Sequence, residues 1–149
     1  MSLEKQIMEQ MKAAMKAKNA VALRALRAVK SAFLLAKTAD GSEEGITEEQ
    51  ALKIIQKQVK QRKDSVAIFT EQGRQDLADP ELEEIAVLEQ FLPEALSEEA
   101  IEKVIITTIQ NLNASGMKDM GKVMGVVSKE LSGQADGKVI ATLVKKNLM

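Results

Sequence analysis

Apolar side chains recur every three or four residues along nearly the whole chain, and this spacing restricts the fold more than any other feature. The first such stripe carries Leu3, Ile7, Met11 and Met15, and comparable stripes follow up to Leu148. This period places apolar side chains on one face of a helix, whereas a strand would need alternation at every second residue. No strand of any length and no internal repeat is evident. The sequence therefore predicts an all-α fold.

Helix-capping residues mark the expected starts of the first two helices. Ser2 precedes the first stripe, where its hydroxyl can accept a backbone N–H. Asn19 can end this helix or cap the next one. The second helix continues the three-four spacing through Leu34, which we expect on its apolar side.

A polar segment from Thr38 to Gly45 predicts a loop before the third helix. Thr47 and Gln50 fit a capping box, in which each side chain bonds the other residue's backbone N–H. No proline or glycine interrupts the following stripe before Gly73, a residue type that commonly ends helices. We therefore expect the longest helix between Glu48 and about Gln72.

An acidic helix is expected next. Asp79 and Pro80 fit its cap and first turn, because the N–H that proline lacks is not needed there. The apolar spacing predicts that Leu82 and Ile85 are buried. Glu84, like the other acidic residues of this helix, is expected to face water.

Pro93 divides the predicted helices into two groups, because the residue before a proline is biased away from helical angles. We expect an N-terminal helical domain of about four helices over residues 1–92 and a hinge at residues 93–97. Three further helices then form a small domain over residues 98–149. A segment of this size is marginal alone, so we expect it to lean on the first domain or on a partner.

Two glycine pairs lie in the predicted C-terminal domain. Gly121 and Gly125, four residues apart, could let another helix or an RNA backbone approach, although tight packing within the domain is the favoured interpretation. Met124 between them is expected in the core rather than on a binding surface. Gly133 and Gly137 belong to a turn that a phosphate could use, but ordinary helix connections have the same composition. The turn residues are Gly133, Ala135, Asp136 and Gly137.

The composition argues against several kinds of chemistry. The chain has no cysteine and no histidine, so it lacks thiol nucleophiles, thiolate metal sites and the usual general base near neutral pH. Serines have no histidine to activate them, and neighbouring glutamates diverge on a helix. We expect no catalytic residues, no cofactor and no metal, with a carboxylate-only metal site left open. The charged N-terminus and the lack of a long apolar run predict a cytoplasmic protein without a membrane segment.

Basic residues are the remaining candidates for binding. The formal net charge is −1, so no domain-wide basic excess exists, yet the C-terminal segment is locally positive. Without tyrosine or tryptophan, base stacking on single strands is disfavoured. The arginines and Lys63 could contact RNA, but internal ion pairs with the acidic helix are favoured for them. The RNA-contact candidates are Arg24, Arg27, Arg62, Lys63, Lys118, Lys122, Lys138, Lys145 and Lys146.

Several short segments together resemble one family. Residues 121–125, 133–137 and 143–148 resemble the C-terminal signature of YqeY-like proteins, and residues 23–27, 61–65, 73–77 and 84–88 resemble its upstream part. The C-terminal module is also similar to the tail of the B subunit of the tRNA-dependent amidotransferase. The resemblance covers nearly the whole chain and rests on the order and spacing of the motifs.

The resemblance implies a helical N-terminal domain joined to a three-helix domain, and an association with tRNA or with a tRNA-amidotransferase or synthetase complex. DNA is not an expected partner. Because the catalytic cradle of the B subunit is missing, carbon–nitrogen ligase activity with glutamine as donor does not carry over and would be assigned by descent alone. The leading hypothesis is a non-catalytic accessory module that binds tRNA. A helical protein–protein adaptor is the alternative.

Overall fold

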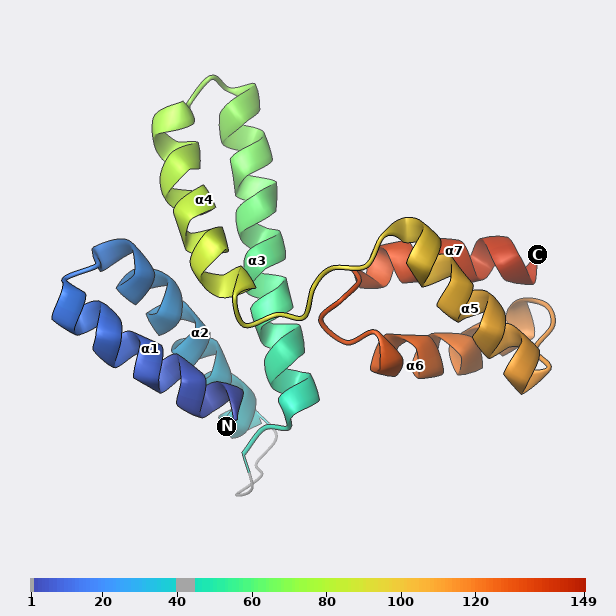
Figure 1. Ribbon diagram of the computed structural model, residues 1–149. Helices are drawn as coiled ribbons and strands as arrows, with labels where there is room; N and C mark the ends of the chain where they lie inside the picture. The colour runs from blue at the N-terminus through green and yellow to red at the C-terminus, as the bar shows by residue number, and fades with distance from the viewer. Residues whose placement is uncertain (1, 40–44) are drawn as a thin grey trace. The chain divides into compact units, whose positions relative to one another are not determined.

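The computed structural model describes residues 2–39 and 45–149, and every regular element in these ranges is helical (Figure 1). The all-α prediction is confirmed. The helices fall into two compact units, Met1–Leu92 and Pro93–Met149, which we call the first and second units. Each has its own apolar core.

The first unit consists of two helical hairpins. Helices α1 (Leu3–Ala17) and α2 (Ala20–Ala39) form one, and α3 (Glu48–Glu71) and α4 (Gln75–Glu89) form the other (Figure 1). Helix α2 packs against α4 and joins the hairpins. Completely buried side chains from three helices meet there, among them Leu26, Val29, Ile55 and Leu88.

The caps predicted at the starts of α1, α2 and α3 are confirmed. The Ser2 hydroxyl accepts the Lys5 N–H, and the Asn19 side chain accepts the Ala22 N–H at 3.1 Å. Thr47 and Gln50 form the complete capping box, with distances of 3.1 and 2.8 Å. The predicted loop starts too early, because α2 continues through Thr38 to Ala39; residues 40–44 of that loop lie outside the described residues.

Replacing Thr47 tests the capping box. We expect Thr47→Ala to lower the free energy of unfolding by about 1 kcal/mol, because the Gln50 N–H loses its acceptor. Thr70→Ala is the matched control, since Thr70 is an exposed residue of the same helix. Chemical denaturation of both variants measures the difference. Equal effects would contradict a capping role for Thr47.

The predicted start of α4 is wrong. The helix begins at Gln75, so Pro80 is its sixth residue and lies inside it. Gly73, at φ +71°, lets the chain reverse after α3, and the Ala78 N–H then bonds the Arg74 carbonyl. Arg74 also donates two hydrogen bonds to Asp76, at 3.0 and 2.9 Å, which lower the pKa of Asp76 and raise the pKa of Arg74. Complete burial of Ala78 favours this earlier start and opposes the cost of a proline inside the helix.

The predicted buried side of α4 is also wrong in part. Leu82 is 45% exposed, whereas Glu84 is only 5% exposed. At 3.6 residues per turn, Glu84 lies about 40° around the helix from fully buried Leu88, and Leu82 lies about 120° away. A similar rotation explains why Met15 is exposed, because each step of four residues turns the next side chain further around the helix. Met15 is therefore 59% exposed, and Ala14 is buried in its place.

The end of the second apolar stripe differs from the prediction as well. Leu34 is 53% exposed, and neighbouring Leu35 is 71% exposed, whereas Phe33 is buried. Because α2 packs against its neighbours along one side only, a single large residue fills that side at this turn.

The second unit contains α5 (Glu98–Leu112), the short 3-10 helix η1 (Met117–Asp119), α6 (Met120–Glu130) and α7 (Gly137–Leu148). Ser97 caps α5 by accepting the Ala100 N–H at 3.1 Å, and Asn113 ends α5 at φ 53°. The core brings together Ile105, Val127 and Val144, none of which is exposed. All three α-helices contribute to it.

The turn between α6 and α7 makes contacts within the second unit. Gly133 is buried and adopts φ +79°, a backbone angle that only glycine tolerates readily. The Gln134 carbonyl accepts the Leu96 N–H at 3.0 Å, so the turn is tied to the segment before α5. Asp136 caps α7 by accepting the Lys138 N–H at 3.0 Å. A carboxylate thus already occupies the start of α7.

Candidate basic surface and ion-pair pocket

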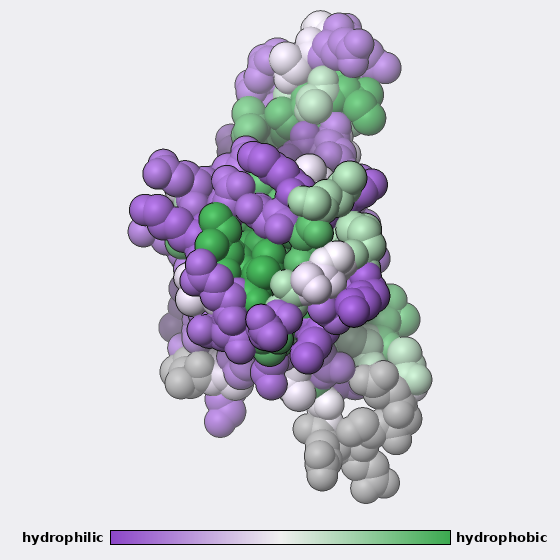
Figure 2. Space-filling view, turned by 90° about the vertical axis from the view of Figure 1, so that its right-hand side faces the viewer, coloured by the Kyte–Doolittle hydropathy of each residue, from purple (hydrophilic) through white to green (hydrophobic). Residues whose placement is uncertain are grey.

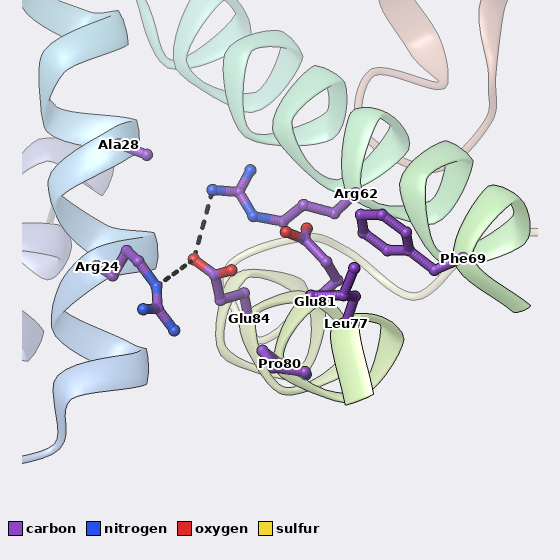
Figure 3. A pocket seen from close by; sticks show the side chains of 8 residues that line it. All are labelled: Arg24, Ala28, Arg62, Phe69, Leu77, Pro80, Glu81 and Glu84. Carbon is purple, nitrogen blue, oxygen red and sulfur yellow. Dashed lines mark ion pairs between the residues drawn. The ribbon is translucent and has the colours of Figure 1, made fainter. Parts of the chain in front are cut away.

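A three-residue ion-pair cluster lies where α2, α3 and α4 meet (Figure 3). The Glu84 Oε1 is 3.6 Å from the Arg24 Nε and 3.8 Å from the Arg62 Nη2. The side chains of Glu84 and Arg62 are only 6% and 13% exposed, whereas that of Arg24 is 60% exposed. Because isolated buried charges are costly, the two guanidinium groups explain how a glutamate is accommodated here.

Arg62 is held from a second direction. Its Nη1 donates to the carbonyl and the side-chain oxygen of Gln58, at 3.0 and 2.7 Å. Within the described part of the chain, its buried Nε has no hydrogen-bond partner. Arg62 is therefore held mainly through its two terminal nitrogens, which contact Gln58 and Glu84.

The other basic candidates of the first unit differ in their surroundings. Lys63 pairs with Glu89 of α4 at 3.1 Å, and both side chains are about half exposed. Arg27 is exposed and belongs to none of the ion pairs formed among residues 2–39 and 45–149. Three of the four candidates in this unit thus contact an acidic side chain.

The five lysine candidates of the second unit are all exposed. Lys146 lies 3.5 Å from Glu102. The others form no ion pair with any residue that the structure describes, and they occupy η1, α6 and α7. We call these four residues, Lys118, Lys122, Lys138 and Lys145, the lysine set.

Gly121 and Gly125 do not serve tight packing inside the second unit, so that interpretation is wrong. Both are exposed, and a methyl group built on either would meet no atom within 4 Å apart from its chain neighbours and the backbone of its own helix. They share the outer side of α6 with Lys122, Val126 and Lys129, all of them exposed. Helix α6 therefore presents bare backbone between lysines. Met124 is partly buried and packs against the core, as does Ala135 of the turn.

Alanine substitutions test this correction. We expect Gly121→Ala and Gly125→Ala each to raise the free energy of unfolding by about 0.5–1 kcal/mol, because alanine favours the helix and the new methyl meets open space. Gly133→Ala is the control and should destabilise, since its φ of +79° strains any side chain. Thermal or chemical denaturation measures all three. Destabilisation by the α6 substitutions would restore the packing interpretation.

The remaining surface is mixed in character. On the face shown in Figure 2, a small group of hydrophobic side chains is bordered largely by hydrophilic ones. The exposed large apolar residues of the second unit include Ile106, Met117 and Val126, at 41–47% exposure. Exposed apolar side chains in this number are normal on folded proteins.

Neither a membrane span nor an acidic metal cluster is found in the described part of the chain. No helix within 2–39 and 45–149 combines the length and apolar character needed to span a bilayer. Nor do the acidic side chains in these ranges gather in a group of three or more that could hold a metal ion.

The fold and its charges define a class of all-helical proteins in which the second unit is compact, helical and rich in exposed lysines. The chain belongs to the family described as Yqey-like protein, whose model matches residues 4–148. The resemblance inferred from the motifs is therefore confirmed.

Two relatives are informative. The chain is 31% identical over 128 residues to altered inheritance of mitochondria protein 41, mitochondrial, from Pyrenophora tritici-repentis, covering 84% of this chain and 68% of the relative. It is 40% identical over 57 residues to a glutamyl-tRNA(Gln) amidotransferase subunit from Thermococcus gammatolerans, covering 36% of this chain and only 9% of that subunit. The name of the first relative places that protein in mitochondria, so the cytoplasmic location stays a prediction for this chain.

Proposed function

We propose that this chain is an accessory module that binds tRNA, or a complex that handles tRNA, through the outer surface of its second unit. The observation that carries the proposal is the lysine set: four exposed ammonium groups without ion-pair partners among the described residues. Lysine ammonium groups attract phosphates and displace their counterions, which is the main source of affinity for nucleic acid.

The lysine-bearing side of α6 suits a phosphate backbone. Gly121 lies between Lys118 and Lys122, and Gly125 lies between Lys122 and Lys129; neither carries a side chain, so a polynucleotide could approach the helix backbone there. The chain contains three phenylalanines and no tyrosine or tryptophan, which leaves few rings on which bases could stack. We therefore propose recognition of a folded RNA through its backbone, as is usual for helical RNA.

The local similarity to the amidotransferase subunit supports tRNA as the RNA class, because that relative's name contains glutamyl-tRNA(Gln). The proposed role is non-catalytic. The chain has no histidine or cysteine, and the 57 matched residues are a small part of that relative. We further propose that the two compact units are separate domains joined by the segment at 93–97.

A salt-dependent titration tests the proposal. Fluorescently labelled tRNA is titrated with the full chain at several salt concentrations, and the logarithm of the affinity is plotted against that of the salt concentration. We expect the affinity to fall as the salt concentration rises. The logarithm of the affinity should decrease by about 0.7–0.9 per unit of the logarithm of the salt concentration for each phosphate that is neutralised. Absent binding, or binding indifferent to salt, would overturn the proposal.

A helical protein–protein adaptor is the second candidate. It is favoured by Leu34 and Leu35, which are 53% and 71% exposed at consecutive positions of α2. An adaptor should retain a protein partner after nuclease treatment and in high salt, because apolar contacts are not screened. Leu35→Ser should release that partner while leaving tRNA binding unchanged.

A further inference from the structure

The ion-pair cluster forms one wall of a pocket of about 510 Å³ in the first unit. Three helices, α2, α3 and α4, supply its lining (Figure 3). The pocket is shallow and largely open to solvent, and its volume lies within the range of about 300–1,000 Å³ typical of small-molecule sites. The polar lining residues are Arg24, Arg62, Glu81 and Glu84, and the apolar ones are Ala28, Phe69, Leu77 and Pro80.

The acidic side of the pocket has unused capacity to accept hydrogen bonds. The two contacts of Glu84, at 3.6 and 3.8 Å, are too long for hydrogen bonds, and no hydrogen bond to its carboxylate is found among the described residues. Buried polar side chains usually have at least one hydrogen-bond partner. Glu81, one turn earlier on α4, is partly exposed and forms no ion pair within the described ranges. Glu84 is thus paired by charge but accepts no hydrogen bond, and Glu81 has neither kind of contact among the described residues.

The basic side has unused capacity to donate. Arg24 contacts Glu84 through its Nε, and its two terminal nitrogens point away from that carboxylate (Figure 3). Because its side chain is 60% exposed, these nitrogens are open to an incoming anion. Arg62 leaves its buried Nε without a partner among the described residues, so the existing cluster does not satisfy either guanidinium completely.

The pocket has equal numbers of guanidinium and carboxylate groups, which disfavours a simple anion or a simple cation. An anion would face Glu81 and Glu84, and a cation would face Arg24 and Arg62. A zwitterion can use both sides, and the apolar lining by Phe69, Leu77 and Pro80 suits an attached hydrocarbon group.

We propose that this pocket binds a free α-amino acid with an apolar side chain. The ammonium group of the ligand lies toward Glu81 and Glu84, and its carboxylate lies toward the terminal nitrogens of Arg24. The side chain packs against Phe69, Leu77 and Pro80. This site belongs to the first unit and does not depend on the lysine set.

Nuclear magnetic resonance titration of the full chain tests the ligand chemistry. Leucine, methionine and phenylalanine are each added to isotopically labelled protein, and N-acetyl-leucine and leucinamide serve as analogues that lack one charge each. We expect saturable shifts at backbone amides near Arg24, Leu77 and Glu84, and binding about tenfold weaker for each analogue, as loss of one charge-assisted hydrogen bond implies. No saturation with any amino acid, or equal binding of an analogue, would overturn the proposal.

Variants locate the site. Arg24→Gln and Glu81→Gln should each weaken leucine binding about tenfold, while their exposed or partly exposed positions leave the fold intact by circular dichroism. Arg27→Gln is the matched control, because Arg27 is an exposed arginine of the same helix outside the pocket lining. Wild-type affinity in both pocket variants, or an equal loss in the control, would show that the ligand does not bind here.

Discussion

Glu84→Leu is expected to lower the free energy of unfolding by about 3 kcal/mol, because it leaves the largely buried guanidinium of Arg62 without its counter-charge. Arg24 contributes little to this cost, since its side chain is 60% exposed and can be solvated by water. The loss should appear in chemical denaturation at neutral pH. Glu83→Leu, at the exposed neighbouring position, is the control and should change stability by less than about 0.5 kcal/mol.

The double variant Arg62→Met and Glu84→Leu separates the charge effect from a packing effect. Apolar replacement of a whole buried ion pair is often neutral or stabilising, so we expect the double variant to recover most of the stability that Glu84→Leu loses. If the double variant is as unstable as the single one, Glu84 matters through its shape and not through its charge. If Glu84→Leu alone is harmless, the cluster does not balance a buried charge.

The all-α fold and the caps of α1 and α3 could be predicted because they depend on residues within one turn of each other. The Ser2 and Thr47 side chains bond backbone groups three residues away, so local sequence is sufficient. The start of α4 depends on more distant effects. Burial of Ala78 and the reversal at Gly73 place Pro80 inside the helix, against its local preference.

The ion-pair pocket could not be predicted in the same way. Glu84 is surrounded by acidic residues in sequence, a pattern that favours a solvated helix face. Its burial follows from its angle to Leu88 and from Arg62, a residue of another helix. The available signal is the four-residue spacing between Glu84 and Leu88, which places both on one side of α4. Glu81 and Phe69 also line the pocket, and no local pattern distinguishes them from their neighbours in sequence.

The candidate lysines could be chosen from the local charge of the sequence. Which of them form ion pairs could not be predicted in this way. Lys146 contacts Glu102 of another helix, whereas Lys145 beside it has no ion pair among the described residues. The exposure of Gly121 and Gly125 likewise depends on which side of α6 faces the core. Val123 and Val127 take that side, so the glycines face outward.

Reversing the charge of the lysine set is expected to abolish most tRNA binding. The variant replaces Lys118, Lys122, Lys138 and Lys145 by glutamate, and the dissociation constant for tRNA at low salt should rise by at least about 100-fold. Each lost phosphate contact should also reduce the salt slope, by about 0.7–0.9. Because all four side chains are exposed, the helical content and melting temperature should change little.

A control with the same number of charges shows whether position or total charge matters. Replacing four exposed lysines of the first unit by glutamate gives the same formal net charge as the lysine-set variant, because each has four Lys→Glu changes starting from −1. These control positions are Lys5, Lys12, Lys16 and Lys57. Because the proposal places the phosphate contacts on the second unit, we expect the control, whose changes all lie in the first unit, to lose less than about tenfold in affinity. Equal losses would mean that tRNA responds to net charge alone, and the lysine set would then have no special part in binding.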